Sequence, residues 1–234
     1  MNSAGATHQR LRRVVGRDLN PVRPLLAPAR RLLLLLPAAL LCSFLAPGMS
    51  PRRDIGNLGE LFGWGLSAVE WATGLFMLGV AFREAVPGSG VPRRFLLWSI
   101  TAVPALVALV TYVTYAVEPT NVPAGLAFRY WYECVLGPMI FGAPMLIAAS
   151  FLALRAFPTR PAAVGALCGL AAGLLEDAGW RLACSVSAPF HVFMAHGLTI
   201  VLMAAIGSLV AVSVDRLRRS RSCVIGGQRG QEQH

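Results

Sequence analysis

Lysine is absent from this chain, and all 21 of its basic residues are arginine. Charge of any kind is scarce, since charged residues make up 14% of the 234 residues while hydrophobic residues make up 56%. The mean hydropathy is accordingly +0.60. A soluble domain of this length has too little polar surface to cover so large an apolar fraction. The composition therefore excludes an ordinary soluble domain and favours a membrane protein.

The common enzyme motifs are missing as well. The chain has no glycine-rich phosphate loop, no G-x-S-x-G nucleophile elbow and no H-E-x-x-H metal motif. It also has no C-x-x-C, the usual motif of thioredoxin-like and quinone-coupled thiol oxidases. We therefore do not expect an enzyme.

The most prominent feature of the chain is a series of long apolar runs. Runs of about 20 residues recur, which is the length that a helix needs to cross a hydrocarbon core of roughly 30 Å. The six predicted spans are Arg31–Ala46, Leu61–Phe82, Phe95–Ala116, Val135–Phe157, Ala162–Leu182 and Phe190–Val214. The expected fold is an all-α polytopic membrane protein, a six-transmembrane-helix bundle over residues 31–214. A cytoplasmic tail, residues 1–30, precedes it, and a disordered cytoplasmic tail, residues 215–234, follows it.

The arginines are unevenly divided between the two sides of these spans. The two terminal tails, the loop Arg83–Arg94 and the connection from Arg155 to Arg160 all fall on one side. The other side carries only Arg52, Arg53, Arg129 and Arg181. Because basic loops stay in the cytoplasm, we expect both termini there. The net charge of +10 then suits contact with the lipid bilayer better than direct nucleic-acid binding, since no nucleic-acid-binding fold surrounds the arginines.

The N-terminal tail divides into two parts. Apolar residues recur at helical spacing between arginines from Thr7 to Leu19, which predicts a basic amphipathic helix. Asn20 precedes a proline and ends that helix, and Pro21–Pro28 forms an extended connector. Such a helix either lies on anionic lipid or docks a cytoplasmic protein, and its periodicity favours neither.

The five cysteines differ in their predicted surroundings. Cys223 lies in the cytoplasmic tail, Cys42 lies inside the first span, and Cys168 is roughly 24 Å along one helix from Cys184. Cys134, which opens the fourth span, and Cys184, which closes the fifth, remain as neighbours on the non-cytoplasmic face, because consecutive spans pack antiparallel. The two thiols form a reactive pair, a static structural disulfide of a scaffold, or two unrelated small buried residues.

Two histidines follow these cysteines at the start of the last span. His191 and His196 are five residues apart, about 500° of α-helical rotation, so they do not share one helix face. They converge on the cysteines only if the helix starts irregularly, as Pro189 favours. The possible metal ligands beside the two cysteines are then His191, His196 and Glu133, although an interfacial histidine is commonly just hydrated.

Acidic residues occur inside two spans. Glu70 lies near the middle of the second span, where an unpaired carboxylate costs several kcal/mol. Glu176 and Asp177 precede Cys184 by one to two turns, and Asp177 can pair with Arg181 at i, i+4. These acids form a polar network beneath the thiols or simply tie helices together. They also support an alternative function, a small membrane transporter or thiol-disulfide oxidoreductase.

Glycines mark one stripe of the fifth span. Gly165, Gly169 and Gly173 recur every four residues. Small residues on one stripe let a second backbone approach closely. We therefore predict a tight helix contact there, without chemistry of its own.

Four segments of the chain resemble one bacterial family. They are "RDLNPVRPLLAPARR" (Arg17–Arg31), "YECVLGPMIFGAPML" (Tyr132–Leu146), "RAFPTRPAAVGALCGLAAGLLEDAGWRLAC" (Arg155–Cys184) and "HVFMAHG" (His191–Gly197). Their content, order and spacing resemble the six-span membrane anti-sigma factors of the NrsF type (negative regulator of sigma F).

The resemblance implies an inhibitor that holds an extracytoplasmic-function sigma factor at the bacterial inner membrane. It implies that Cys134 and Cys184 sense oxidants or heavy metals from the periplasm, with no resident cofactor beyond a transient heavy-metal ion. Ser185 and Ala195 depart from the family pattern, which has proline and an aromatic residue there. The docking residues that the resemblance implies are Asp18, Leu19, Pro21, Val22, Arg23, Pro24 and Leu25.

Overall fold

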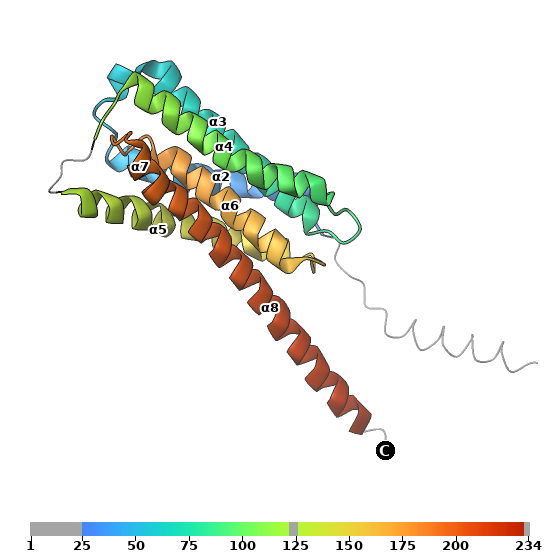
Figure 1. The fold of residues 1–234 in the computed structure, drawn as a ribbon. Coiled ribbons are helices and arrows are strands. Elements are labelled where there is room, and N and C mark those ends of the chain that lie inside the picture. The colour runs from blue at the N-terminus through green and yellow to red at the C-terminus, as the bar shows by residue number, and fades with distance from the viewer. Residues whose placement is uncertain (1–24, 122–125, 232–234) are drawn as a thin grey trace, which may run out of the picture.

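The computed structural model describes residues 25–121 and 126–231. Within them, six helices are long and apolar enough to cross a membrane, which confirms the predicted all-α six-span bundle (Figure 1). These helices are α2 (Pro28–Met49), α3 (Ile55–Glu84), α4 (Arg93–Val117), α5 (Ala127–Leu154), α6 (Pro161–Trp180) and α8 (Leu198–Gln231). A short helix, α7 (Pro189–His191), and a π-helix, η2 (Val192–Gly197), lead directly into α8.

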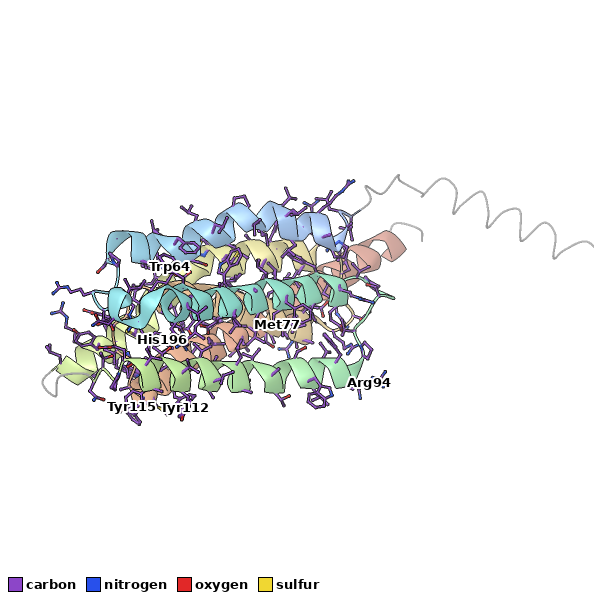
Figure 2. All side chains as sticks on the ribbon, turned by 90° about the horizontal axis from the view of Figure 1, so that it is seen from above. Trp64, Met77, Arg94, Tyr112, Tyr115 and His196 are labelled. Atoms are coloured by element: carbon purple, nitrogen blue, oxygen red, sulfur yellow. The ribbon has the colours of Figure 1, made fainter. Side chains whose placement is uncertain are left out.

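The six helices alternate in direction, so the bundle has two distinct ends. One end, here called the thiol end, holds Cys134 and Cys184; the other, the tail end, holds Leu25 and the loop between α3 and α4. His196 lies toward the thiol end and Arg94 at the tail end (Figure 2). Because the number of spans is even, α2 begins and α8 ends at the tail end (Figure 1).

Helix α6 is the centre of the bundle and is the most deeply buried span. It packs against α2, α3, α5 and α8. A Cβ added at Gly165 would collide with the carbonyl oxygen of Gly207, and one at Gly169 would collide with that of Met203. The predicted glycine stripe is therefore confirmed as a backbone-to-backbone contact between α6 and α8.

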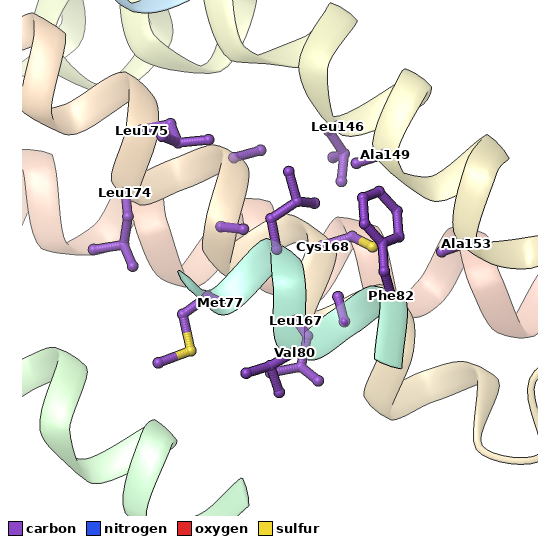
Figure 3. Packing of buried hydrophobic residues seen from close by; sticks show 14 of the residues in the cluster. Met77, Val80, Phe82, Leu146, Ala149, Ala153, Leu167, Cys168, Leu174 and Leu175 are labelled. Carbon is purple, nitrogen blue, oxygen red and sulfur yellow. The ribbon is translucent and has the colours of Figure 1, made fainter. Parts of the chain in front are cut away.

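The main apolar core is formed mostly by α3, α5 and α6, with a few residues from α2, α4 and α8. Phe82, Ala149 and Cys168 are among its fully buried members (Figure 3). Cys168 lies in this apolar layer as a small hydrophobic residue, consistent with the buried role that free cysteine often has.

Buried polar contacts join the loops at the tail end. The Glu84 carboxylate, 2% exposed, lies 3.0 Å from Nε of Arg160 and accepts a hydrogen bond of 2.6 Å from the backbone N–H of Val91. These contacts tie the loop after α3 to the loop after α5. At the tail end, these two loops are therefore held together by buried polar contacts.

The chain after Val214 differs from our expectation of disorder. Helix α8 continues without interruption to Gln231, within the residues that the structure describes. Asp215 and Arg219 pair at i, i+4 across 2.9 Å, and Arg218 donates to the carbonyl of Leu154 and lies over the ring of Phe157. These contacts favour continued helix. The predicted N-terminal amphipathic helix and the docking residues before Leu25 lie outside the described residues, while Leu25 itself is exposed.

Candidate functional site

Two buried thiols approach each other at the thiol end. The Cys134 thiol donates to the Cys184 sulfur across 3.5 Å, and both cysteines are free. This confirms the proximity predicted from the antiparallel arrangement of consecutive spans. The cysteines lie differently along their helices than we expected, because Cys134 is two turns inside α5 and Cys184 lies four residues beyond the end of α6 at Trp180.

The early end of α6 has a local cause. Arg52, in the connection between α2 and α3, donates its backbone N–H to the carbonyl of Leu182 across 2.8 Å and a side-chain N–H to the carbonyl of Arg181 across 3.4 Å. The N–H groups of Ala183 and Cys184 both bond to the carbonyl of Trp180. The chain therefore leaves the helix in a tight turn, which directs Cys184 inward.

The two histidines converge because the last span begins with a π-helix. In a π-helix the backbone bonds join residues five apart, so His191 and His196 come to lie one above the other. Their ring centroids are 5.6 Å apart. The irregular start that Pro189 favours is thus present as η2. An α-helical register would have placed the two rings on different faces.

Four side chains gather into one buried group, which we call the C2H2 group: Cys134, Cys184, His191 and His196. One ligand atom from each lies within 4.8 Å of every other. The Nε2 atom of His191 is 3.7 Å from the Cys184 sulfur. Glu133, a predicted ligand, is not brought into this group; it faces outward and pairs with Arg129 across 2.8 Å.

A series of buried ionic contacts continues from His196 toward the middle of the bundle. Nδ1 of His196 is 2.6 Å from one oxygen of Asp177, and the other oxygen accepts a 2.9 Å hydrogen bond from Arg181. Nε of Arg181 also lies 2.9 Å from a carboxylate oxygen of Glu70. Glu70 is fully buried, so this contact gives the intramembrane carboxylate a partner. These contacts join η2, α6 and α3.

Glu176 is a separate case among these acids. It is 1% exposed, and its Oε1 atom has no hydrogen-bond partner. It does not join the chain of contacts formed by Asp177, Arg181 and Glu70.

The electrostatics of the group favour a reactive sulfur at Cys184, which lies between two spans. The hydrogen bond from Cys134 lowers the pKa of the Cys184 thiol well below its ordinary value. The contact with His191 and the proximity of His196 act in the same direction, against the opposing effect of burial. A thiolate, not a thiol, is the nucleophile and the metal ligand. Of the two sulfurs, Cys184 is therefore the one whose surroundings favour the thiolate form.

Hydrogen bonds that the sequence did not reveal hold the segments around the group. Thr120 and Ser187 bond reciprocally, each donating its backbone N–H to the hydroxyl of the other across 2.9 Å. The indole N–H of Trp131 donates to the carbonyl of Met194 in η2 across 2.9 Å. These bonds fix the segment after Cys184 and the π-helix. The only sequence signal for them is hydroxyl and indole side chains near the predicted span ends.

A small cavity borders the group. It has a volume of about 20 Å³, and its wall includes Arg52, Arg181, Ser187, Cys184 and His196. Such a volume holds one water-sized occupant. The cavity gives a small reagent a place beside the Cys184 sulfur.

Comparison with known families agrees with the resemblance. The model of the family described as NrsF, negative regulator of sigma F, matches residues 16–216. The chain belongs to the NrsF family. Searches of curated proteins and of solved structures gave no significant match.

The NrsF match covers both the C2H2 group and the segment from Asp18 to Leu25. It also covers the first five spans and the last span as far as residue 216. The family description makes this chain a negative regulator, a role that needs no catalysis. The transporter or oxidoreductase alternative has no comparable match.

Proposed function

We propose that this chain is a membrane-bound anti-sigma factor with a thiol sensor on the opposite side of the membrane from its docking segment. The N-terminal segment from Asp18 to Leu25 holds an extracytoplasmic-function sigma factor. Reaction of Cys134 and Cys184 with an oxidant or a heavy-metal ion releases that partner. The observation that carries this proposal is a pair of free thiols 3.5 Å apart in a member of the NrsF family.

The orientation of the bundle follows from its arginines. The tail end and its loops carry most of them, which supports a cytoplasmic tail end in the inner membrane of a bacterium. The thiol end then faces the periplasm, an oxidising compartment in which a disulfide persists. Sensor and sigma factor are on opposite sides of the bilayer.

The spacing of the sulfurs suits oxidation. A disulfide has an S–S length of about 2.05 Å, so the two sulfurs need to approach by roughly 1.5 Å from their 3.5 Å separation. The Cys184 thiolate attacks one oxygen of a peroxide and becomes a sulfenic acid, while the O–O bond breaks and the other oxygen leaves as hydroxide, which takes a proton from solvent to become water. The Cys134 thiol then displaces hydroxide from that sulfur to form the S–S bond, and its proton converts the hydroxide to a second water. Closure moves α5 relative to the turn after α6.

The signal needs a route to the tail end, about the full length of the bundle away. The backbone contact between α6 and α8 is such a route, because neither helix can move at Gly165 or Gly169 without the other. The series of buried ionic contacts from His196 through Asp177 and Arg181 to Glu70 is a second route, and it extends to α3. A coupling of about 1–3 kcal/mol between the two ends is typical of such regulation.

The deciding experiment is capture of the partner from the host. Tagged protein is solubilised from host membranes with and without peroxide, and co-purifying proteins are identified by mass spectrometry. A sigma factor is expected in the untreated sample and is expected to be lost on treatment. The double variant Cys134→Ser, Cys184→Ser should retain it under peroxide, while Cys168→Ala should behave as wild type.

A second variant tests the docking segment. Leu19→Asp is expected to abolish capture without changing the amount of protein in the membrane. Absence of a sigma factor from the untreated wild type, with the protein folded, would overturn the anti-sigma role. Release by peroxide from the double cysteine variant would overturn only the sensing role.

A further inference from the structure

We propose that the C2H2 group is a four-ligand site for a soft divalent cation of the Zn²⁺ or Cd²⁺ class, with Asp177 as its positioning residue. The binding site rests on the geometry of the four side chains. Its role as a trigger for release rests on the proposed function. The thiols are then two ligands of a complete coordination sphere, and the histidines supply the other two.

Two of the separations between ligand atoms are close to those of a tetrahedral site, and all of them are within 4.8 Å. With Zn–S bonds of 2.3 Å and Zn–N bonds of 2.0–2.1 Å, two sulfurs are roughly 3.8 Å apart and a sulfur and a nitrogen roughly 3.6 Å. The observed Cys134–Cys184 separation is 3.5 Å, and the observed separation of the Cys184 sulfur from Nε2 of His191 is 3.7 Å. A cation thus needs only small side-chain adjustments to bind among them.

His196 has the arrangement that a metal-binding histidine usually has. Its Nδ1 atom is 2.6 Å from the Asp177 carboxylate, which fixes the proton on that nitrogen and leaves the Nε2 lone pair free. His196 is only 1% exposed, and its Nε2 atom has no hydrogen-bond partner in the structure. A buried nitrogen without a partner is costly, and a cation would satisfy it.

The backbone is built to bring the fourth ligand in. Only the π-helical register places His191 and His196 one above the other, and Trp131 on α5 holds that register by donating to the carbonyl of Met194. Thr199, in the first turn of α8, donates to the carbonyl of Val135, the residue after Cys134. Bonds between α5 and the start of the last span therefore hold the cysteine and histidine ligands in register.

Charge balance also favours a divalent cation. Two thiolates neutralise a divalent ion, and two neutral imidazoles complete the sphere without adding charge. A buried site with no net charge avoids most of the cost of desolvating an ion. The nearby charges of Asp177 and Arg181 already neutralise each other across 2.9 Å. The thiolates prefer a soft cation over Mg²⁺ or Ca²⁺.

The test uses the purified full-length protein in detergent, reduced and freed of metal with a chelator. Co²⁺ is added as a spectroscopic probe, and Zn²⁺ is then used to displace it. One Co²⁺ per chain is expected, with intense visible bands of a tetrahedral ion and near-ultraviolet thiolate-to-cobalt absorption. Octahedral, weak bands would show that the four ligands do not enclose the ion and would overturn the proposal.

Variants separate the contributions of the ligands. Cys134→Ser should reduce the thiolate-to-cobalt absorption, because only the Cys184 thiolate then remains as a ligand. His191→Gln should weaken binding at least tenfold. Asp177→Asn, which changes a positioning residue, should weaken Zn²⁺ binding by about 10–100-fold while the bands remain tetrahedral. Cys168→Ala, in the apolar core, is the matched control and should bind as wild type. Unchanged affinity in His191→Gln would reduce the site to a thiol pair and overturn it.

A measurement on wild-type protein keeps the test independent of variant folding. N-ethylmaleimide labels accessible thiols, and peptide mass spectrometry counts the label at each cysteine. One equivalent of Zn²⁺ should protect Cys134 and Cys184 from labelling, and excess Mg²⁺ should not. Labelling of both at the same rate with and without Zn²⁺ would contradict the proposal.

The metal site and the anti-sigma function can fail independently, and the experiments tell the two failures apart. Tetrahedral Co²⁺ binding with no effect of Zn²⁺ on sigma-factor capture would establish the site and remove its role as trigger. Loss of sigma-factor capture on peroxide treatment, in protein that binds no Co²⁺, would keep the anti-sigma sensor and remove the metal site.

Discussion

Replacement of Asp177 by asparagine tests the buried ionic chain. The Asp177 side chain is 1% exposed and serves both Arg181, at 2.9 Å, and His196, at 2.6 Å. Asparagine has nearly the same shape as aspartate but keeps only one acceptor oxygen. If that oxygen stays with His196, the amide N–H₂ group faces the Arg181 guanidinium, and two donors then oppose each other. Removal of one member of a buried pair costs about 3–5 kcal/mol. Because Arg181 keeps Glu70 at 2.9 Å, we expect the lower value, about 3 kcal/mol.

The assay is unfolding of the purified protein in mixed micelles with increasing dodecyl sulfate, followed by circular dichroism. The matched control is Glu133→Gln, which removes the carboxylate of another i, i+4 pair with arginine. The side chains of Glu133 and Arg129 are 50% and 74% exposed, so water screens their interaction and the control should unfold as wild type does. Equal stability of Asp177→Asn and Glu133→Gln would refute the reasoning that burial gives the Asp177 contacts their strength.

Three further predictions concern the sulfur, the glycine contact and the π-helix. Because the pKa of Cys184 is depressed, its thiolate persists to lower pH than that of an ordinary cysteine. Its rate of alkylation by iodoacetamide should therefore fall only at pH values below the usual thiol range. Cys134→Ala, which removes the donor to the Cys184 sulfur, should move that fall to higher pH. Gly169→Leu should destabilise the bundle by about 1–3 kcal/mol or more in the same unfolding assay. Gly79→Ala, where an added methyl meets nothing within 4 Å, should not destabilise it, and equal losses would argue against the close contact. Trp131→Phe removes one donor to a π-helix carbonyl and should speed amide hydrogen exchange in residues 194–197 several-fold; unchanged exchange would show that the π-helix holds without it.

The spans and the thiol pair were predictable because each depends on a strong one-dimensional signal. Twenty-residue apolar runs have few structures open to them other than a membrane helix. Alternation of direction then places the start of one span beside the end of the previous span, and Cys134 and Cys184 meet for that reason. The pairing of Asp177 with Arg181 follows from helical spacing alone.

The rest depends on how the helices rotate about their own axes. In a helix that is apolar on every side, the sequence gives little indication of which face is inward. The contact of Glu70 with Arg181 and that of Asp177 with His196 each join different helices, so neither was predictable. The convergence of His191 and His196 required a π-helix, which Pro189 suggested without specifying its register.

The π-helix has a consequence for the far end of the molecule. Helix α8 is one continuous rod of 34 residues, about 51 Å long, and its distal part projects beyond the other helices (Figure 1). The π-helical turn accommodates one residue more than an α-helical turn does. If that residue were absorbed into α-helix, everything after Gly197 would rotate by about 100° and shift by about 1.5 Å along the axis. A change confined to the segment beside the thiols would therefore turn the whole of α8, including the part that projects beyond the other helices at the opposite end of the bundle.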